Sequence, residues 1–123
     1  MNAGVPQLVS WLEADFYLVT PIEEEEVLRA RDLTSFDEDW SIASRELEKR
    51  IERGGFGPDV DSVIRKVREV AFKKVFAATG SHELSACASD DFDLVAKAIV
   101  CGEEESRFVQ RLRECYRSGR IAT

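Results

Sequence analysis

The fold is decided by residues 59–79, which read DVDSVIRKVREVAFKKVFAAT. Apolar residues recur in this segment at intervals of three and four, the spacing that places side chains on one face of an α-helix. They are Val60, Val63, Ile64, Val67, Val70, Ala71, Val75 and Ala78, and Phe72 and Phe76 widen the same face. Because Gly80 follows directly and glycine commonly ends a helix, the pattern predicts one long central helix over about residues 59–79.

The sequence before this segment predicts three more helices. The first covers residues 5–16 and has Pro6 in its first turn, where proline is tolerated. The second is predicted to start at Thr20-Pro21-Ile22-Glu23, which has the spacing of a capping box with proline at the first helical position. The third runs from Ser35 to a stop at Gly54-Gly55 and carries an apolar stripe.

The sequence after Gly80 predicts two or three further helices. Residues 81–88 are weakly periodic and predict one or two helical turns. The triplet Ser89-Asp90-Asp91 predicts a capped helix start, and the helix that follows ends at Gly102. Residues 103–117 predict the last helix. Since no run of alternating β-branched residues occurs, we predict an all-α fold, a compact irregular bundle of six or seven helices.

Length and composition fit one globular domain. The chain has 123 residues, and 44% of them are hydrophobic, which is enough for one core. We therefore predict a single all-α domain over residues 1–123, in which residues 1–4 are flexible. No self-similar repeat of solenoid length is found.

The charge and the cysteines exclude several classes of protein. Seventeen basic and twenty-four acidic residues give a net charge of −7, which repels a phosphate backbone, so nucleic acid is not an expected partner. No apolar run has the roughly 18 residues of a membrane span, and no signal peptide precedes the first helix, so we expect a cytoplasmic protein with no membrane partner. The three cysteines lack the paired spacing of a zinc site or a disulfide framework, and neither a metal nor a cofactor is predicted.

The acidic residues gather in the N-terminal third of the chain. Residues 13–39 carry ten acids and two arginines, a sum of −8. Such a surface attracts a basic partner and speeds association. The candidate partner-binding residues are Glu23, Glu24, Glu25, Asp37, Glu38, Asp39 and Trp40. Two alternatives remain open: the acids are solvated helix starts, and Trp40 is a core residue, because it lies on the apolar stripe.

A second candidate site surrounds the only histidine. His82, with Asp90 and Asp91 nearby in sequence, supplies the residue types of an acid–base pair or a small-ligand site between helices. Cys87 is flanked by Ala86 and Ala88, and an apolar setting raises a thiol pKa, so a nucleophilic cysteine is not predicted.

We therefore predict a small acidic cytosolic module that binds another protein with a basic surface, such as an immunity or inhibitor protein or an adaptor, and that is not an enzyme. One alternative is a small-ligand-binding protein or an enzyme with an inter-helix pocket that uses carboxylates and His82. Another is a structural subunit of a homo-oligomer, for example a homodimer.

Overall fold

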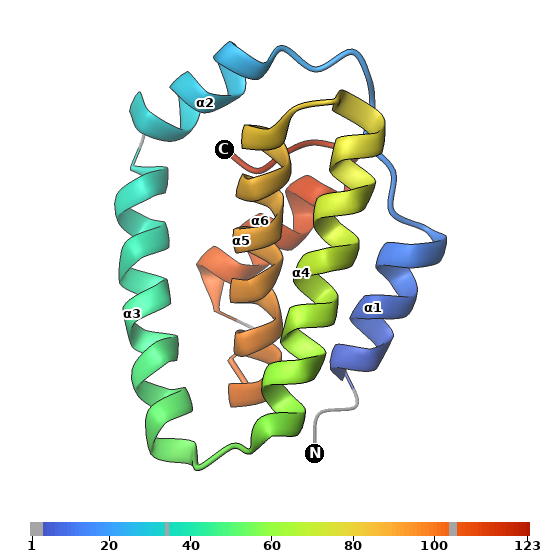
Figure 1. Cartoon of the computed structure of the whole chain (residues 1–123). Helices are drawn as coiled ribbons and strands as arrows, with labels where there is room; N and C mark the ends of the chain where they lie inside the picture. Colours follow the sequence, from blue (N-terminus) through green and yellow to red (C-terminus); the bar gives the residue numbers. More distant parts are fainter. Residues whose placement is uncertain (1–3, 34, 104–105) are drawn as a thin grey trace.

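The computed structural model describes residues 4–33, 35–103 and 106–123. In these residues the chain forms six helices and no strand (Figure 1). The helices are α1 (Gly4–Ala14), α2 (Glu24–Leu33), α3 (Phe36–Gly54), α4 (Pro58–Thr79), α5 (His82–Cys101) and α6 (Arg107–Arg117). The predicted all-α bundle is confirmed. No helix in this described part of the chain has the length and apolar character needed to span a bilayer.

The helix predicted over residues 59–79 is α4, the longest of the six. It begins at Pro58, one residue before the predicted start, since proline suits the first helical turn. It ends where Gly80 adopts a left-handed conformation with φ of 67° and donates its backbone N–H to the carbonyl oxygen of Phe76 at 2.7 Å. That conformation favours glycine, which is why the stop could be predicted.

Helix α5 carries the largest share of the core. It lies between α3 and α4 in Figure 1, and it also contacts α1 and α6. Its fully buried apolar side chains include Leu84, Phe92, Leu94 and Val95. The five other helices contribute unequally to the core, and α2, which crosses one end of the bundle, has no buried residue.

The predicted helix start at Ser89-Asp90-Asp91 is wrong, because α5 runs unbroken from His82 to Cys101. The actual cap is Ser81, whose hydroxyl accepts a hydrogen bond from the backbone N–H of Leu84 at 3.0 Å. Ser89 and Asp91 lie inside the helix and are buried. Asp91 tolerates this position because an arginine from another helix meets its charge, as described below.

The predicted start of the second helix at Thr20-Pro21 is also wrong, since α2 begins at Glu24. The backbone N–H of Val19 donates to the carbonyl oxygen of Gly119 at 2.8 Å, which fixes the preceding segment against the C-terminal end of the chain. The first helical hydrogen bond joins the N–H of Val27 to the carbonyl oxygen of Glu23 at 3.1 Å. A capping pattern is local, and here the helix starts about one turn later, after a segment that contacts the C-terminal end of the chain.

Candidate functional site

A fully buried carboxylate, Asp91 of α5, is the centre of a polar cluster among the described residues. Arg31 of α2 binds it with both arms of the guanidinium, Nη1 to Oδ2 at 2.8 Å and Nη2 to Oδ1 at 3.0 Å. Tyr116 of α6 donates its hydroxyl to Oδ2 at 2.6 Å, and Trp40 of α3 donates Nε1–H to Oδ1 at 3.0 Å. One carboxylate therefore joins four helices.

The ionisation of this cluster follows from its burial and its partners. Burial raises the pKa of Asp91, and the hydrogen bonds and charge of Arg31, followed by the hydrogen bonds of Tyr116 and Trp40, oppose that rise. Burial works against the charge of Arg31, but the hydrogen bond and charge of Asp91 outweigh it and raise the guanidinium pKa. Burial and the charge of Asp91 also raise the pKa of Tyr116, so its hydroxyl stays protonated and donates.

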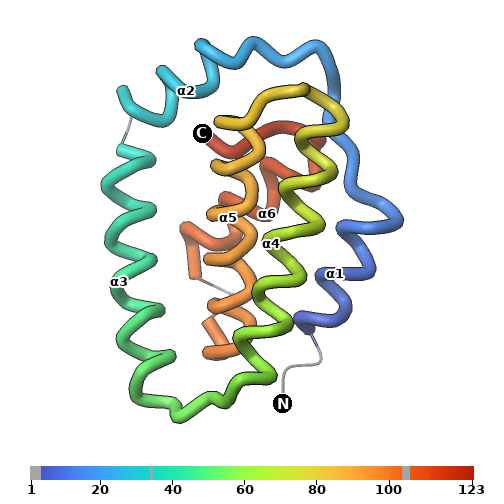
Figure 2. The backbone as a smooth tube through the Cα atoms, in the orientation of Figure 1, coloured from blue at the N-terminus to red at the C-terminus, as the bar shows by residue number. Residues whose placement is uncertain are grey.

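Arg31 is the main polar anchor of α2. Besides binding Asp91, it donates from Nη1 to the carbonyl oxygen of Ala122 at 2.9 Å, and its guanidinium lies 4.4 Å from the ring centre of Phe36. Figure 2 shows the C-terminal segment ending beside α5, close to α2. The half-buried Val27 and Leu28 add apolar contacts to the core. The position of α2 therefore depends on Arg31, a small apolar face and the hydrogen bond that the hydroxyl of Ser81 donates to Glu24.

Next to this cluster, residues of α2, α3 and α5 line an open hollow of about 470 Å³, which we call the acidic hollow. Four carboxylates line it, those of Asp32, Asp37, Glu83 and Asp90. Arg31 and Trp40 also reach it, and Leu28 and Cys87 complete the lining. Asp90 forms an ion pair with Arg68 of α4 at 2.7 Å. The hollow thus joins residues of both candidate sites, Asp37 and Trp40 from the first and Asp90 from the second.

The remaining acidic candidates lie outside this hollow and do not form one patch. Glu23 and Glu25 are exposed at the start of α2, and Glu24 accepts a hydrogen bond from the hydroxyl of Ser81. Glu38 is exposed, and Asp39 faces α6, with its Oδ2 3.9 Å from Nη1 of Arg111. Because α2 separates the two groups by about 15 Å of helix, the sequence cluster becomes two acidic regions.

Trp40 is half-buried and packs against the core, while its indole N–H is held by Asp91. The core interpretation of Trp40, which the sequence left open, is the one its packing favours. The indole edge still lines the acidic hollow.

The structure does not bring His82 and Asp91 together. They are nine residues apart in one helix, which is two and a half turns, so they lie on opposite faces of α5. His82 is exposed, and its ring meets the edges of Phe72 and Phe76 with ring centres 5.6 and 5.3 Å away. The thiol of Cys87 has a raised pKa because of burial, as its apolar sequence neighbours led us to expect.

Sequence reasoning missed Arg31, Tyr116, Asp32 and Glu83. Arg31 and Asp91 are 60 positions apart, and nothing local connects them. A buried acid was detectable only indirectly, because Asp91 lies between Ala88, Phe92 and Val95 in helical spacing and therefore on an apolar face. Because Ser89-Asp90-Asp91 has the pattern of a helix cap, the burial of Asp91 was not predicted.

The described residues define a small all-α protein whose central polar cluster is a structural ion pair. Within the class of small helical proteins, comparison with known families gives a specific assignment. The profile of the family described as Immunity protein PIM1 matches residues 9–123. The chain therefore belongs to this family of immunity proteins. A search of the curated proteins found no match to it.

The ion pair gives a direct prediction for stability. Arg31→Ala leaves Asp91 buried without its cation, and breaking a buried pair in this way costs about 3–5 kcal/mol of unfolding free energy. Arg29→Ala, on the exposed face of the same helix, is the matched control and should change stability by less than about 0.5 kcal/mol. Urea denaturation of the two variants measures the difference. Equal losses would show that the pair does not hold α2 in place.

Proposed function

We propose that this chain protects its cell by binding a toxin protein in the cytosol and blocking it, with no catalytic step of its own. The observation that carries this proposal is the match of residues 9–123 to an immunity protein family. A protein that acts by stoichiometric binding needs a docking surface rather than an active site. The exposed carboxylates of this chain can supply such a surface.

The partner we propose has a basic surface, and the acidic hollow is its docking site. Asp32, Asp37 and Glu83 form no ion pair among the described residues, so their charge faces solvent. A net charge of −7 adds a long-range field of the same sign. Fields of this kind raise the association rate with a basic protein by about ten-fold to a thousand-fold, and salt weakens the effect.

The acidic starts of α2 and α3 extend the proposed docking surface. Glu23, Glu24 and Glu25 are exposed at or just before the start of α2, and Glu38 is exposed in the first turn of α3, whereas Asp39 pairs with Arg111 of α6. An enzymatic role has less support. His82 packs against two phenylalanine rings, and Asp91 is enclosed by three hydrogen-bond donors, so neither faces a shared cavity as an acid–base pair requires.

The proposal is tested by affinity capture of the tagged chain from a lysate of its own cells at low and high salt. We expect one stoichiometric, basic, salt-sensitive partner. When expressed alone, that partner should stop growth, and co-expression of this chain should restore it. A captured partner that is harmless to cells would contradict the toxin-blocking role.

The acidic hollow is tested by charge reversal. The triple variant Asp32→Lys, Asp37→Lys and Glu83→Lys should slow association with the captured partner about ten-fold or more and reduce its salt dependence. The matched control is Glu13→Lys, Glu52→Lys and Glu114→Lys, which makes the same change in net charge at exposed positions outside the hollow. Stopped-flow kinetics compares the two sets. If both slow association equally, only net charge matters and the docking site is wrong.

Two free thiols provide an independent map of the same surface. Cys87 lines the acidic hollow, and Cys101 lies at the other end of α5, and both are half-buried with a pKa raised by burial. Partner binding should slow alkylation of Cys87 by N-ethylmaleimide several-fold and leave Cys101 unchanged. Mass spectrometry of the labelled chain measures both rates in one sample. Protection of Cys101 alone would place the partner elsewhere.

A further inference from the structure

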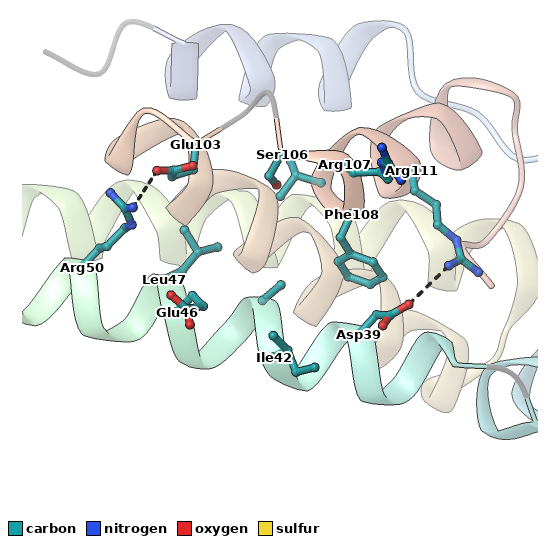
Figure 3. Close-up of a pocket in the computed structure, with 12 residues that line it drawn as sticks. Asp39, Ile42, Glu46, Leu47, Arg50, Glu103, Ser106, Arg107, Phe108 and Arg111 are labelled. Carbon is teal, nitrogen blue, oxygen red and sulfur yellow. Dashed lines mark ion pairs between the residues drawn. The ribbon is translucent and has the colours of Figure 1, made fainter.

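A second open groove lies between α3 and α6 and shares no lining residue with the acidic hollow. It has a volume of about 500 Å³. Figure 3 shows Leu47 and Phe108 reaching into the space between the two helices. Ala43 and Val109 complete an apolar floor, and Ile42 borders it with 46% of its surface exposed. Apolar grooves between helices are a common form of binding surface.

The two ends of the groove are closed by ion pairs. Arg50 Nη2 lies 3.0 Å from Glu103 Oε1 at one end, and Arg111 Nη1 lies 3.9 Å from Asp39 Oδ2 at the other (Figure 3). The stretch of α3 between them covers three helical turns, or about 16 Å. The groove therefore has the length of a short helix.

Its two walls carry opposite charges. Glu46 projects from α3 and Arg107 from α6, and no ion pair among the described residues engages either of them. An occupant that matches the groove has an apolar stripe for the floor, a basic flank toward Glu46 and an acidic flank toward Arg107. This is the pattern of an amphipathic helix, and helices bind apolar grooves through residues spaced three and four apart.

A second copy of this chain does not fit the groove as well. Two copies with a net charge of −7 each repel one another, and the groove carries no excess positive charge to offset that repulsion. A partner with both signs of charge meets no such barrier.

We infer that the α3–α6 groove binds an amphipathic helix of the partner protein, which carries lysine or arginine on one flank and glutamate or aspartate on the other. This inference rests on the proposed function in one respect, namely that the chain acts by binding protein. Helix α3 then forms a shared wall, with Asp37 facing the acidic hollow and Ile42 facing the groove. The hollow steers the partner electrostatically, and the groove supplies the apolar contact that slows its release.

The test uses a synthetic helical peptide of about 11 residues, which spans the roughly 16 Å between the two ion pairs, with leucines in one stripe, lysines on one flank and glutamates on the other. Its control has the same composition with the leucines dispersed around the helix. Titration into the isotope-labelled full chain at physiological salt is followed by amide NMR. The striped peptide should shift the amides of Ile42, Leu47 and Phe108, and the dispersed peptide should not.

Two exposed apolar positions provide matched variants. Ile42→Gln should weaken binding of the striped peptide about ten-fold, because it removes an apolar contact at the border of the floor. Val19→Gln, at a position 58% exposed on the segment between α1 and α2, should leave it unchanged. Equal binding of both peptides, shifts outside the groove, or an unaffected Ile42→Gln variant would overturn the inference.

Failure of this inference is separable from failure of the proposed function. If a toxic partner is captured and neutralised but the striped peptide does not shift the groove amides, the groove inference is wrong and the proposed function stands. If the striped peptide binds the groove and the captured partner is harmless, the groove stands and the toxin-blocking role is wrong.

Discussion

A carboxylate without access to water must find a cation and hydrogen-bond donors within the protein, and this requirement organises the structure around Asp91. Its partners come from α2, α3 and α6, while Asp91 itself lies in α5, the helix with the largest buried share. The apolar core holds α1, α4 and α5 together without help from this cluster. Helix α2 is different, because it has no buried residue and depends on Arg31 for its position.

This constraint connects stability to the candidate binding surfaces. The acidic hollow lies where α2, α3 and α5 meet. Arg31 and Trp40 hold these three helices together through their hydrogen bonds to Asp91, and both residues also line the hollow. The carboxylates of Asp32 and Asp37 are therefore positioned through the buried Asp91, whereas Glu83 and Asp90 lie on α5 itself. In this arrangement the ion pair is a positioning device, and its cost in desolvation is offset by the hydrogen bonds that complete it.

Periodicity was sufficient to predict the fold class, the helix over residues 59–79 and its stop at Gly80, because these depend on local backbone preferences and on which face is apolar. The helix starts at Thr20 and Ser89 could not be predicted correctly from the same rules. The segment at Thr20 lies next to Val19, whose backbone N–H bonds to distant Gly119, and at Ser89 a buried acid has the sequence pattern of a cap. The acidic candidates were found by composition, but their division into two regions by α2 is a tertiary property, as are the roles of Asp32 and Glu83.

The central claim is that Asp91 holds α2 and the start of α3 against the rest of the bundle. Hydrogen–deuterium exchange of the Asp91→Asn variant tests it most directly, because asparagine keeps the size of the side chain and removes its charge. We expect amides of α2 and the first half of α3 to lose much more protection than those of α4. An equal loss of protection in all helices, or unchanged protection in α2, would contradict the claim.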